Sequence, residues 1–455
     1  MAISAEAGIL AMLKTYYAKE GLQNLLYRND PLLKKIKKVR VEGKQQNFSA
    51  LYSRGGAVSA NFLTAKRLAT ESAKAKEFQV TPGQIFSGCV FNAKEISASK
   101  TARGAYINVA SAKFFANAES FRKTLAVALY GSGHGELFTY GASATDTIPA
   151  SQAIGATVSF TFPRYAIMGI DIGSELEIKT SAAATSAVNT LTVVSIDGLT
   201  VKAKISTATT TAVSLASDVV CLSGCTDGSG KPLLPIGLAG WIPSGNVSGA
   251  DNFFGVNRSE ARDRLAGSVV DNSSSSSSTK YGTIQEGILA LRRMGSLADM
   301  IVLNDEDYLA LQKEVEAKTN FLKTAGTGKT AKTGLGYEGF GISVSSNWLD
   351  NVIDSPYCPK GTAYILDSEA VELWTYTNAD KIADGVVNNE PGKADVQADG
   401  EVANRPYQLL VDDLFSVTPG TDTSDGAAAL VTLNFFGSFA VTNPSVCGVV
   451  KFYES

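Results

Sequence analysis

Two short stretches of the chain carry residue types at a spacing that suggests chemistry. The first is AGTGKTAKTGLGYEGFG at 325–341, where GKT imitates the end of a phosphate-binding loop. The full motif needs a glycine at position 323, which is Lys323, and a strand before it, whereas EVEAKTNFL is typical of a helix. A G-x-G-x-x-G pattern in the same stretch has a helix before it and a strand after it, the reverse of the dinucleotide-binding order. The residues therefore argue against a nucleotide hydrolase and predict a loop.

The second stretch is GSGHG, which holds Ser132 and His134. A nucleophile and its base must lie within hydrogen-bond reach, and a third group must orient the base. Residues two apart in a glycine-rich turn rarely meet this condition, so we expect a helix-terminating loop. His134 is the single histidine of the chain, so a His-rich metal centre is excluded. The sequence predicts a protein that is not an enzyme and needs no cofactor.

The cysteines and the hydropathy exclude other classes. The five cysteines are an odd number scattered through 455 residues, which favours reduced buried thiols over a disulfide framework. Cys221 and Cys225 are the one close pair, and they lack the second pair that structural zinc needs. The N-terminus lacks the pattern of a signal peptide, and no run of 18 apolar residues occurs, so we expect no membrane span.

Apolar periodicity predicts the elements that position the rest of the chain. The spacing predicts helices at 5–27, 106–130 and 283–294, and a further helix that Asn304 caps. Between 43 and 100, short alternating runs bounded by glycine and proline fit a long hairpin with exposed edges. We expect this hairpin to lie on a neighbour because it has few apolar residues of its own to bury.

The middle of the chain reads as a small β structure. Five alternating runs at roughly ten-residue spacing lie between 145 and 225, with an Asp197-Gly198 turn between two of them, and they predict a small β-barrel or sandwich. Beyond the serine run at 273–278, which we expect to be a flexible loop, helices and strands mix and the tail is strand-rich. The predicted fold class is α+β.

Charge is distributed unevenly along the chain. The whole chain has 41 Lys and Arg against 44 Asp and Glu, but residues 1–105 have 17 against 7, a net +10, and the remainder has 24 against 37, a net −13. A basic extension on an acidic body suggests that extensions of one subunit lie on bodies of the next. The alternative is that opposite charges are only segregated on one monomer.

The order of these elements resembles that of the major capsid proteins of tailed bacteriophages, which have the Hong Kong 97-type fold. The runs GLAGWIP, FFGVNRSEARDRLAG and ADMIVLNDEDYLAL resemble stretches of the central portion of that family. The resemblance covers nearly the whole chain, in architecture rather than in an invariant motif. It implies an N-arm, an extended loop, a spine helix, and peripheral and axial domains, with an inserted small β-domain in addition.

The resemblance also implies domain boundaries. They are 1–42 for the N-terminal arm, 43–100 for the extended loop, 101–144 for the spine helix of the peripheral domain, 145–225 for peripheral strands and the inserted β-domain, 226–400 for the axial domain, and 401–455 for C-terminal strands that complete the sheets.

The function that the resemblance implies is self-assembly into hexamers and pentamers of an icosahedral shell around double-stranded phage DNA. The protein would be built in the host cytoplasm and reside in the virion. Portal, scaffolding or decoration proteins would be further partners, the DNA would be contacted non-specifically, and no membrane is involved. The basic residues expected to contact other subunits or DNA are Lys34, Lys35, Lys37, Lys38, Arg40, Arg54, Lys66 and Arg67. Alternatives are an encapsulin-like bacterial compartment and a β-rich phage tail or adhesin protein.

Overall fold

The chain forms two compact units, each built from segments that are distant in sequence. The computed structural model describes residues 30–41, 45–53, 58–68, 74–92, 117, 119–141, 144, 146–209, 212–247, 249, 252–296, 298–316, 342–344, 347–349, 351–376, 415–419 and 428–453. The first unit comprises Met1–Asn47, Gln79–Gly240 and Glu372–Ala440, and the second comprises Phe48–Phe78, Trp241–Val371 and Val441–Ser455. The chain therefore passes between the two units several times.

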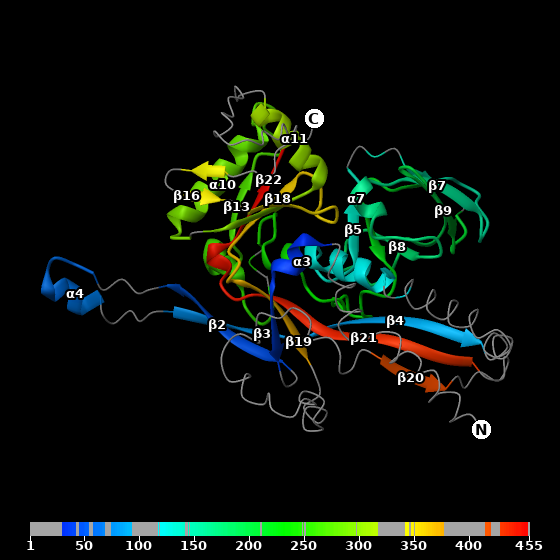
Figure 1. Ribbon diagram of the computed structural model, residues 1–455, viewed down its shortest axis with the longest axis horizontal. Helices are drawn as coiled ribbons and strands as arrows, with labels where there is room; N and C mark the ends of the chain where they lie inside the picture. The colour runs from blue at the N-terminus through cyan, green and yellow to red at the C-terminus, as the bar shows by residue number, and fades with distance from the viewer. Residues whose placement is uncertain are drawn as a thin grey trace, which may run out of the picture. The chain divides into compact units, whose positions relative to one another are not determined.

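A five-stranded sheet in the first unit joins the N-terminal arm to strands from the C-terminal part of the chain (Figure 1). Its strands are β1 (Lys37–Val41), β4 (Gly83–Asn92), β19 (Val371–Tyr376), β20 (Phe415–Pro419) and β21 (Ala428–Val441), and helix α3 (Pro31–Lys35) precedes β1. β1 runs parallel to β19, while β4 and β20 run antiparallel to β21. Residues 119–130 are helical, and the Phe121 ring lies 6.2 Å from the Phe435 ring of β21, so this helix packs beside the sheet.

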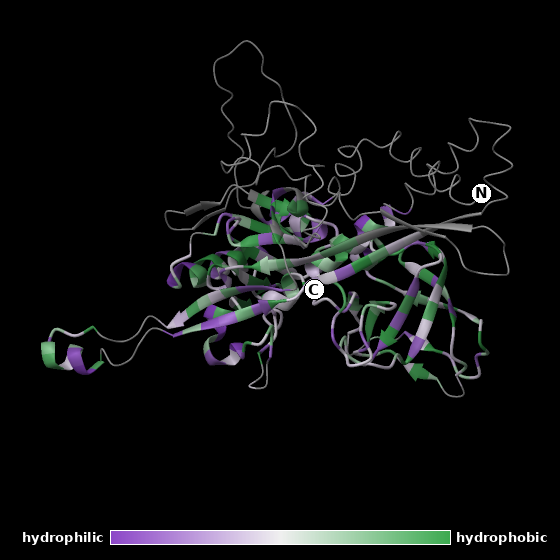
Figure 2. Ribbon diagram, turned by 90° about the horizontal axis from the view of Figure 1, so that it is seen from below, coloured by the Kyte–Doolittle hydropathy of each residue, from purple (hydrophilic) through white to green (hydrophobic). Residues whose placement is uncertain are grey.

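A second sheet of the first unit holds six antiparallel strands in the order β5-β12-β8-β9-β10-β7. They are β5 (Glu136–Thr139), β7 (Thr157–Thr161), β8 (Glu175–Lys179), β9 (Asn189–Asp197), β10 (Thr200–Ile205) and β12 (Val219–Leu222). The short strands β6 (Thr147–Ile148) and β11 (Val213–Ser214) pair separately, and α7 (Arg164–Ile167) follows β7. Along β10, Val201 and Ala203 are buried and Lys202 and Lys204 are exposed. Figure 2, coloured by hydropathy, shows bands of hydrophilic and hydrophobic residues along the strands.

The second unit is built on a mixed five-stranded sheet with the order β13-β22-β18-β14-β17. The strands are β13 (Ser268–Asp271), β14 (Met300–Leu303), β17 (Asn351–Asp354), β18 (Thr362–Leu366) and β22 (Gly448–Lys451). Helices α10 (Lys280–Arg293) and α11 (Asp305–Glu316) cover it, and Ile284, Ile288 and Leu291 of α10 enter the same buried cluster as Ile365 and Val450. Short elements are α8 (Leu238–Trp241), η1 (Arg258–Ala261), α9 (Arg262–Leu265), β15 (Ile342–Val344), β16 (Asn347–Leu349) and η5 (Pro444–Val446).

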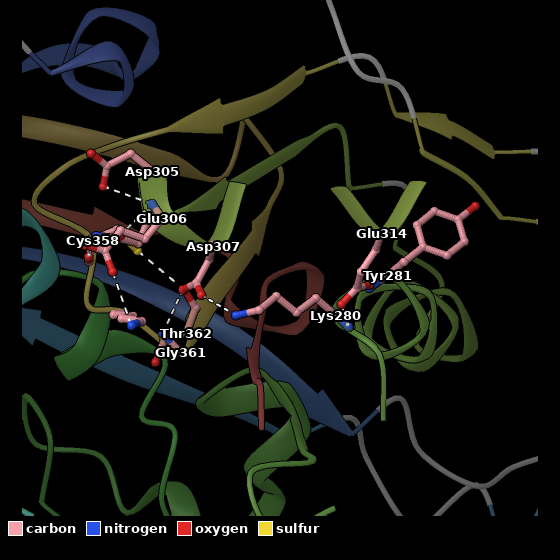
Figure 3. A network of polar contacts seen from close by, with 11 residues as sticks. Lys280, Tyr281, Asp305, Glu306, Asp307, Glu314, Cys358, Gly361 and Thr362 are labelled. Carbon is pink, nitrogen blue, oxygen red and sulfur yellow. Dashed lines mark hydrogen bonds and ion pairs between the residues drawn. The ribbon is translucent and has the colours of Figure 1, made fainter. Parts of the chain in front are cut away.

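A polar network joins α11 to the turn before β18 (Figure 3). Asp307 is 1% exposed; its carboxylate accepts the Gly361 N–H at 2.7 Å and pairs with the Lys280 ammonium. The Glu314 carboxylate accepts the first N–H groups of α10, those of Lys280 and Tyr281, both at 3.1 Å. These contacts satisfy donors at a helix start and neutralise a buried charge, so they fix the two helices against the sheet.

The extended loop is a two-stranded ribbon of β2 (Gln46–Ser53) and β3 (Lys74–Val80), with helix α4 (Phe62–Leu68) at its far end (Figure 1). The hairpin expected from the sequence is therefore present, but it ends at β3. The strand at 83–92, which the sequence analysis assigns to the loop, pairs with β21 from Gly83 to Asn92. That pairing depends on a partner more than 300 residues away in the chain, so no local pattern predicts it.

Most elements predicted from periodicity are confirmed. The five alternating runs of the middle region form β7, β8, β9, β10 and β12, and the two helices of the mixed region form α10 and α11. Asn304 caps α11 as expected, since its side chain accepts the Glu306 N–H at 3.0 Å. The predicted 5–27 helix, the first part of the 106–130 helix and the loop at 325–341 lie outside the described residues.

Candidate interaction surface

The N-terminal arm is held on the first unit by its own capping and by burial. Asp30 accepts the N–H groups of Leu32 and Leu33 at 2.8 and 3.4 Å, and Pro31 occupies the first helical turn, so α3 begins at a defined point. Leu32 and Leu33 are fully buried. The arm is therefore a packed element of the first unit from residue 30 onward.

The basic residues of the arm take different positions. Lys35 is exposed, and Lys37 forms a 3.0 Å ion pair with Glu372 of the adjacent strand β19. Lys38 is 3% exposed, and its ammonium donates to the Leu33 carbonyl oxygen. Desolvation lowers the pKa of Lys38 to about 8. Lys38 therefore serves the internal packing of the arm.

Two further arm residues are placed by their backbone alone. Lys34 belongs to α3, and Arg40 belongs to β1, where it is paired with Thr375 of β19.

Of the predicted loop residues, Lys66 and Arg67 lie in the last turn of α4 and are exposed, whereas Arg54 lies outside the described residues. Lys66 and Arg67 therefore lie together at the loop tip in the second unit, whereas Lys35 lies on the arm in the first unit.

An aromatic cluster anchors the base of the ribbon. Phe48 of β2 stacks on Phe78 of β3 with ring centroids 5.2 Å apart, and both rings contact Trp241, at 5.9 and 5.6 Å. Phe253 lies edge-on to Trp241 at 4.9 Å, and the Arg258 guanidinium lies 3.9 Å from the Phe253 ring centroid. Trp241, Phe253 and Arg258 come from the two runs GLAGWIP and FFGVNRSEARDRLAG, so those runs hold the loop.

The tip of the ribbon, in contrast, buries nothing. Helix α4 has no buried residue, and Val58, Phe62 and Leu63 are 92%, 79% and 73% exposed. The helix is nevertheless capped, because the Asn61 side chain accepts the Leu63 N–H at 2.9 Å. A preformed helix that presents two large apolar side chains and two cations, Lys66 and Arg67, to solvent is suited to contact another molecule. The sequence analysis missed this helix, although Asn61 before an apolar pair is a start signal.

The Ser132 and His134 pair differs from expectation. The Ser132 Oγ and His134 Nδ1 atoms lie 2.9 Å apart, so the residues do reach each other despite their spacing of two. Glu136 accepts the Ser132 hydroxyl and backbone N–H at 2.8 and 2.9 Å, and His134 Nε2 lies 3.2 Å from the Gly230 carbonyl oxygen. The Glu136 carboxylate thus binds the serine and does not orient the imidazole, whose Nε2 faces a backbone carbonyl instead. The cluster closes the turn after the 119–130 helix.

A cavity of about 400 Å³ lies in the first unit between β4, the 119–130 helix and the ends of β8 and β12. Glu175 and Cys225 are the titratable residues in its lining, and burial raises the pKa of Cys225 to about 12, which removes its nucleophilic thiolate at neutral pH. Within the described residues, no three His, Cys, Asp or Glu side chains group as metal ligands, and no helix is long and apolar enough to cross a membrane.

Comparison with solved structures identifies the fold. The chain matches a chain of the cyanophage A-1(L) capsid asymmetric unit with a TM-score of 0.51 at 10% sequence identity, over 94% of this chain and 93% of that one. A chain of Mycobacterium phage Ogopogo (TM-score 0.40, 10% identity, 93% and 92% covered) and an encapsulin complex from Synechococcus elongatus (TM-score 0.37, 9% identity, 92% and 88% covered) are more distant. No family model and no curated protein matches the sequence.

The cyanophage match extends over nearly the full length of both chains, so it concerns the architecture as a whole rather than one shared motif. The chain has the α+β fold of Hong Kong 97-type capsid proteins, as the order of its elements indicated.

Proposed function

We propose that this chain is the major capsid protein of a tailed bacteriophage. Copies of it assemble into hexamers and pentamers of an icosahedral shell that encloses double-stranded DNA, and the protein resides in the virion after assembly in the host cytoplasm. The observation that carries the proposal is the cyanophage capsid match over 94% of this chain. In this function the protein is structural and not an enzyme.

The extended loop supports self-association. Its tip helix α4 exposes Phe62 and Leu63, and neither side chain is buried by its own chain. Burying two such side chains against a neighbour contributes roughly 3 to 6 kcal/mol before the cost of ordering. The neighbour that is always present in a shell is another copy of the same chain.

The basic residues fit the same proposal to different degrees. Lys35, Lys66 and Arg67 are exposed, and they would face a body that carries a net charge of −13 beyond residue 105. Lys37 pairs with Glu372 of its own subunit. An alternative partner for Lys35 is the packaged DNA, where contacts would be independent of base sequence and weakened by salt. Portal, scaffolding and decoration proteins are further partners of a shell of this kind.

The test is the content of particles isolated from the native host. A capsid protein is the most abundant polypeptide, by mass spectrometry, in closed icosahedral particles whose double-stranded DNA resists nuclease. An encapsulin-like protein would form closed shells that hold a protein cargo and no DNA. A tail or adhesin protein would be absent from the shell, and cryo-electron microscopy would place its density elsewhere in the virion. Either of the last two results contradicts the proposal.

A further inference from the structure

The short helical segment at residues 258–265 contacts both strands of the extended loop. Residues 258–265 form η1 and α9, and they belong to the same unit as residues 48–78 of the ribbon. From this turn, the Glu260 carboxylate forms a 3.0 Å ion pair with Lys76 of β3. The Arg264 guanidinium donates at 2.6 Å to the Tyr52 carbonyl oxygen of β2. The turn therefore contacts both strands, and Glu260 is also hydrogen-bonded to the Tyr52 side chain of β2.

The turn is itself fixed to the body. Arg258 is buried, stacks on Phe253 and donates at 3.2 Å to the Trp241 carbonyl oxygen. Arg262 donates to the carbonyl oxygens of Pro243 and Gly245 at 3.0 and 2.7 Å. Because these bonds hold the turn in place, Glu260 and Arg264 are presented to the ribbon from a rigid base.

Strand alternation places Lys76, which pairs with Glu260, and the aromatic Phe78 on one face of the ribbon. Side chains two apart on a strand share a face, so Lys76 lies on the same face of β3 as the buried Phe78. Leu51 and Glu77, on the opposite parity, are exposed. Phe78 and Lys76 thus make their contacts on the same face, with Phe78 at the base of the ribbon and Lys76 further toward its tip.

At the far end of the loop, helix α4 has no buried residue. The stretch from Tyr52 to Phe62 spans at most about 35 Å, so a rotation of about 10° at the base moves the tip by up to about 6 Å. A displacement of that size takes an apolar side chain out of a pocket on a neighbour. The direction of the loop therefore has to be fixed at its base.

We propose that Glu260 and Arg264 are positioning residues that set the direction of the extended loop. Lys76 and the Tyr52 carbonyl are their targets. The Lys76–Glu260 pair is exposed and so is weakened by salt, while the Arg264 bond is partly buried and is weakened less. The inference rests on the proposed function, because the direction of the loop matters only where the loop contacts a neighbouring subunit of the shell.

The experiment measures the loop direction in the unassembled subunit. Spin labels at Ala60→Cys, next to α4, and at Ser276→Cys, on the body of the second unit, report a distance distribution by pulsed electron paramagnetic resonance. Both positions are exposed. Of the five native cysteines, Cys221, Cys225, Cys358 and Cys447 are buried, and the chain without introduced cysteines gives the labelling background of all five, Cys89 included. The unaltered loop is expected to give one narrow distribution.

Lys76→Glu places two carboxylates together and is expected to broaden or shift the distribution, and the double variant Lys76→Glu with Glu260→Lys is expected to restore it. Arg264→Met is expected to broaden it as well. Lys313→Glu, a charge reversal at an exposed lysine of α11, is the matched control and should leave it unchanged. Thermal unfolding of each variant shows that the body remains folded.

An unchanged distribution in Lys76→Glu and in Arg264→Met overturns the inference, whether or not the variants assemble. A changed distribution in variants that still build normal particles limits the contacts to the free subunit and also contradicts the assigned purpose. Failure of the capsid proposal is seen separately, because it concerns the particles from the native host and not the loop of the isolated chain.

Discussion

The Asp307 carboxylate accepts the Gly361 backbone N–H at 2.7 Å, and both groups are buried. The same carboxylate pairs with Lys280 at the start of α10. Asp307 therefore ties α11 to the turn before β18 and to a second helix. Its neighbour Glu306 pairs instead with Lys360 at 3.2 Å on the surface, where both side chains are at least 40% exposed.

We expect Asp307→Asn to destabilise the second unit by roughly 2 to 4 kcal/mol, because it leaves the partly buried Lys280 without its counter-charge. Glu306→Gln, one residue away, is the control and should cost less than about 1 kcal/mol, since exposed ion pairs contribute little. Urea unfolding followed by far-ultraviolet circular dichroism measures both. Equal losses in the two variants would contradict this assignment of the buried pair.

Gly237 is expected to tolerate no side chain. Its N–H donates to the Gly131 carbonyl oxygen at 3.1 Å, and a Cβ at this position would lie 2.1 Å from the Ala128 carbonyl oxygen. Gly237→Ala therefore has to push the 230–237 segment away from the 119–130 helix, at a cost of about 1 to 3 kcal/mol or more. Gly228→Ala is the control, since a Cβ there meets nothing within 4 Å. Thermal unfolding should separate the two variants.

Local signals in the sequence account for the elements that were predicted and for those that were missed. Helices α10 and α11 combine a periodic apolar face with side-chain caps from Thr279 and Asn304, so both could be found. The strands of the six-stranded sheet alternate in hydropathy and follow one another closely, which makes them visible as well. The pairing of β4 with β21 depends on a distant partner, and no local pattern encodes it.

The basic arm shows why the site was harder to predict than the fold. Five cations within seven positions look alike in the sequence, yet the chain changes from helix to strand at Ile36, and this change determines which side chains face inward. Lys38 falls on the buried face of β1, whereas Lys37 falls on the exposed one. Glu260 and Arg264 belong to a run that was quoted for the family resemblance, but their contact with the loop required the structure.

Lys38 and Lys35 are expected to respond differently to the loss of charge. The pKa of Lys38 is lowered from 10.5 to about 8 by desolvation, so the folded state holds fewer protons than the unfolded state between these values. The Lys38 contribution to stability therefore rises with pH from about 8 to 10.5, and it can be read between pH 8 and 9, below the range in which the buried thiols titrate; Lys38→Met should abolish it while the fold is kept. Lys35→Met, at an exposed position of the arm, should lower the yield of particles. Denaturation at several pH values and particle counts measure the two effects.

The buried thiols predict a loss of stability in alkali. Burial raises the pKa of Cys221, Cys225 and Cys447 from 9.0 to about 12. A raised value in the folded state means that the stabilisation is complete below pH 9 and is lost as the pH rises toward 12, by about 1.4 kcal/mol per pH unit for each thiol. Cys447→Ala should reduce the slope of this decline by the contribution of one thiol, about 1.4 kcal/mol per pH unit. In the native state at pH 8, none of the three should react with a thiol reagent; rapid reaction would contradict their burial.

The tip of the extended loop gives the most direct prediction about assembly. Phe62 and Leu63 contribute no core packing to their own subunit, so Phe62→Ser with Leu63→Ser should leave the thermal unfolding temperature unchanged. The same variant should fail to form closed particles, because it removes the apolar surface offered to the neighbour. Leu309→Ser is the matched control, since Leu309 is 51% exposed on α11 and lies outside the loop. Normal particles from the double variant, counted by negative-stain microscopy, would show that the tip is not a contact.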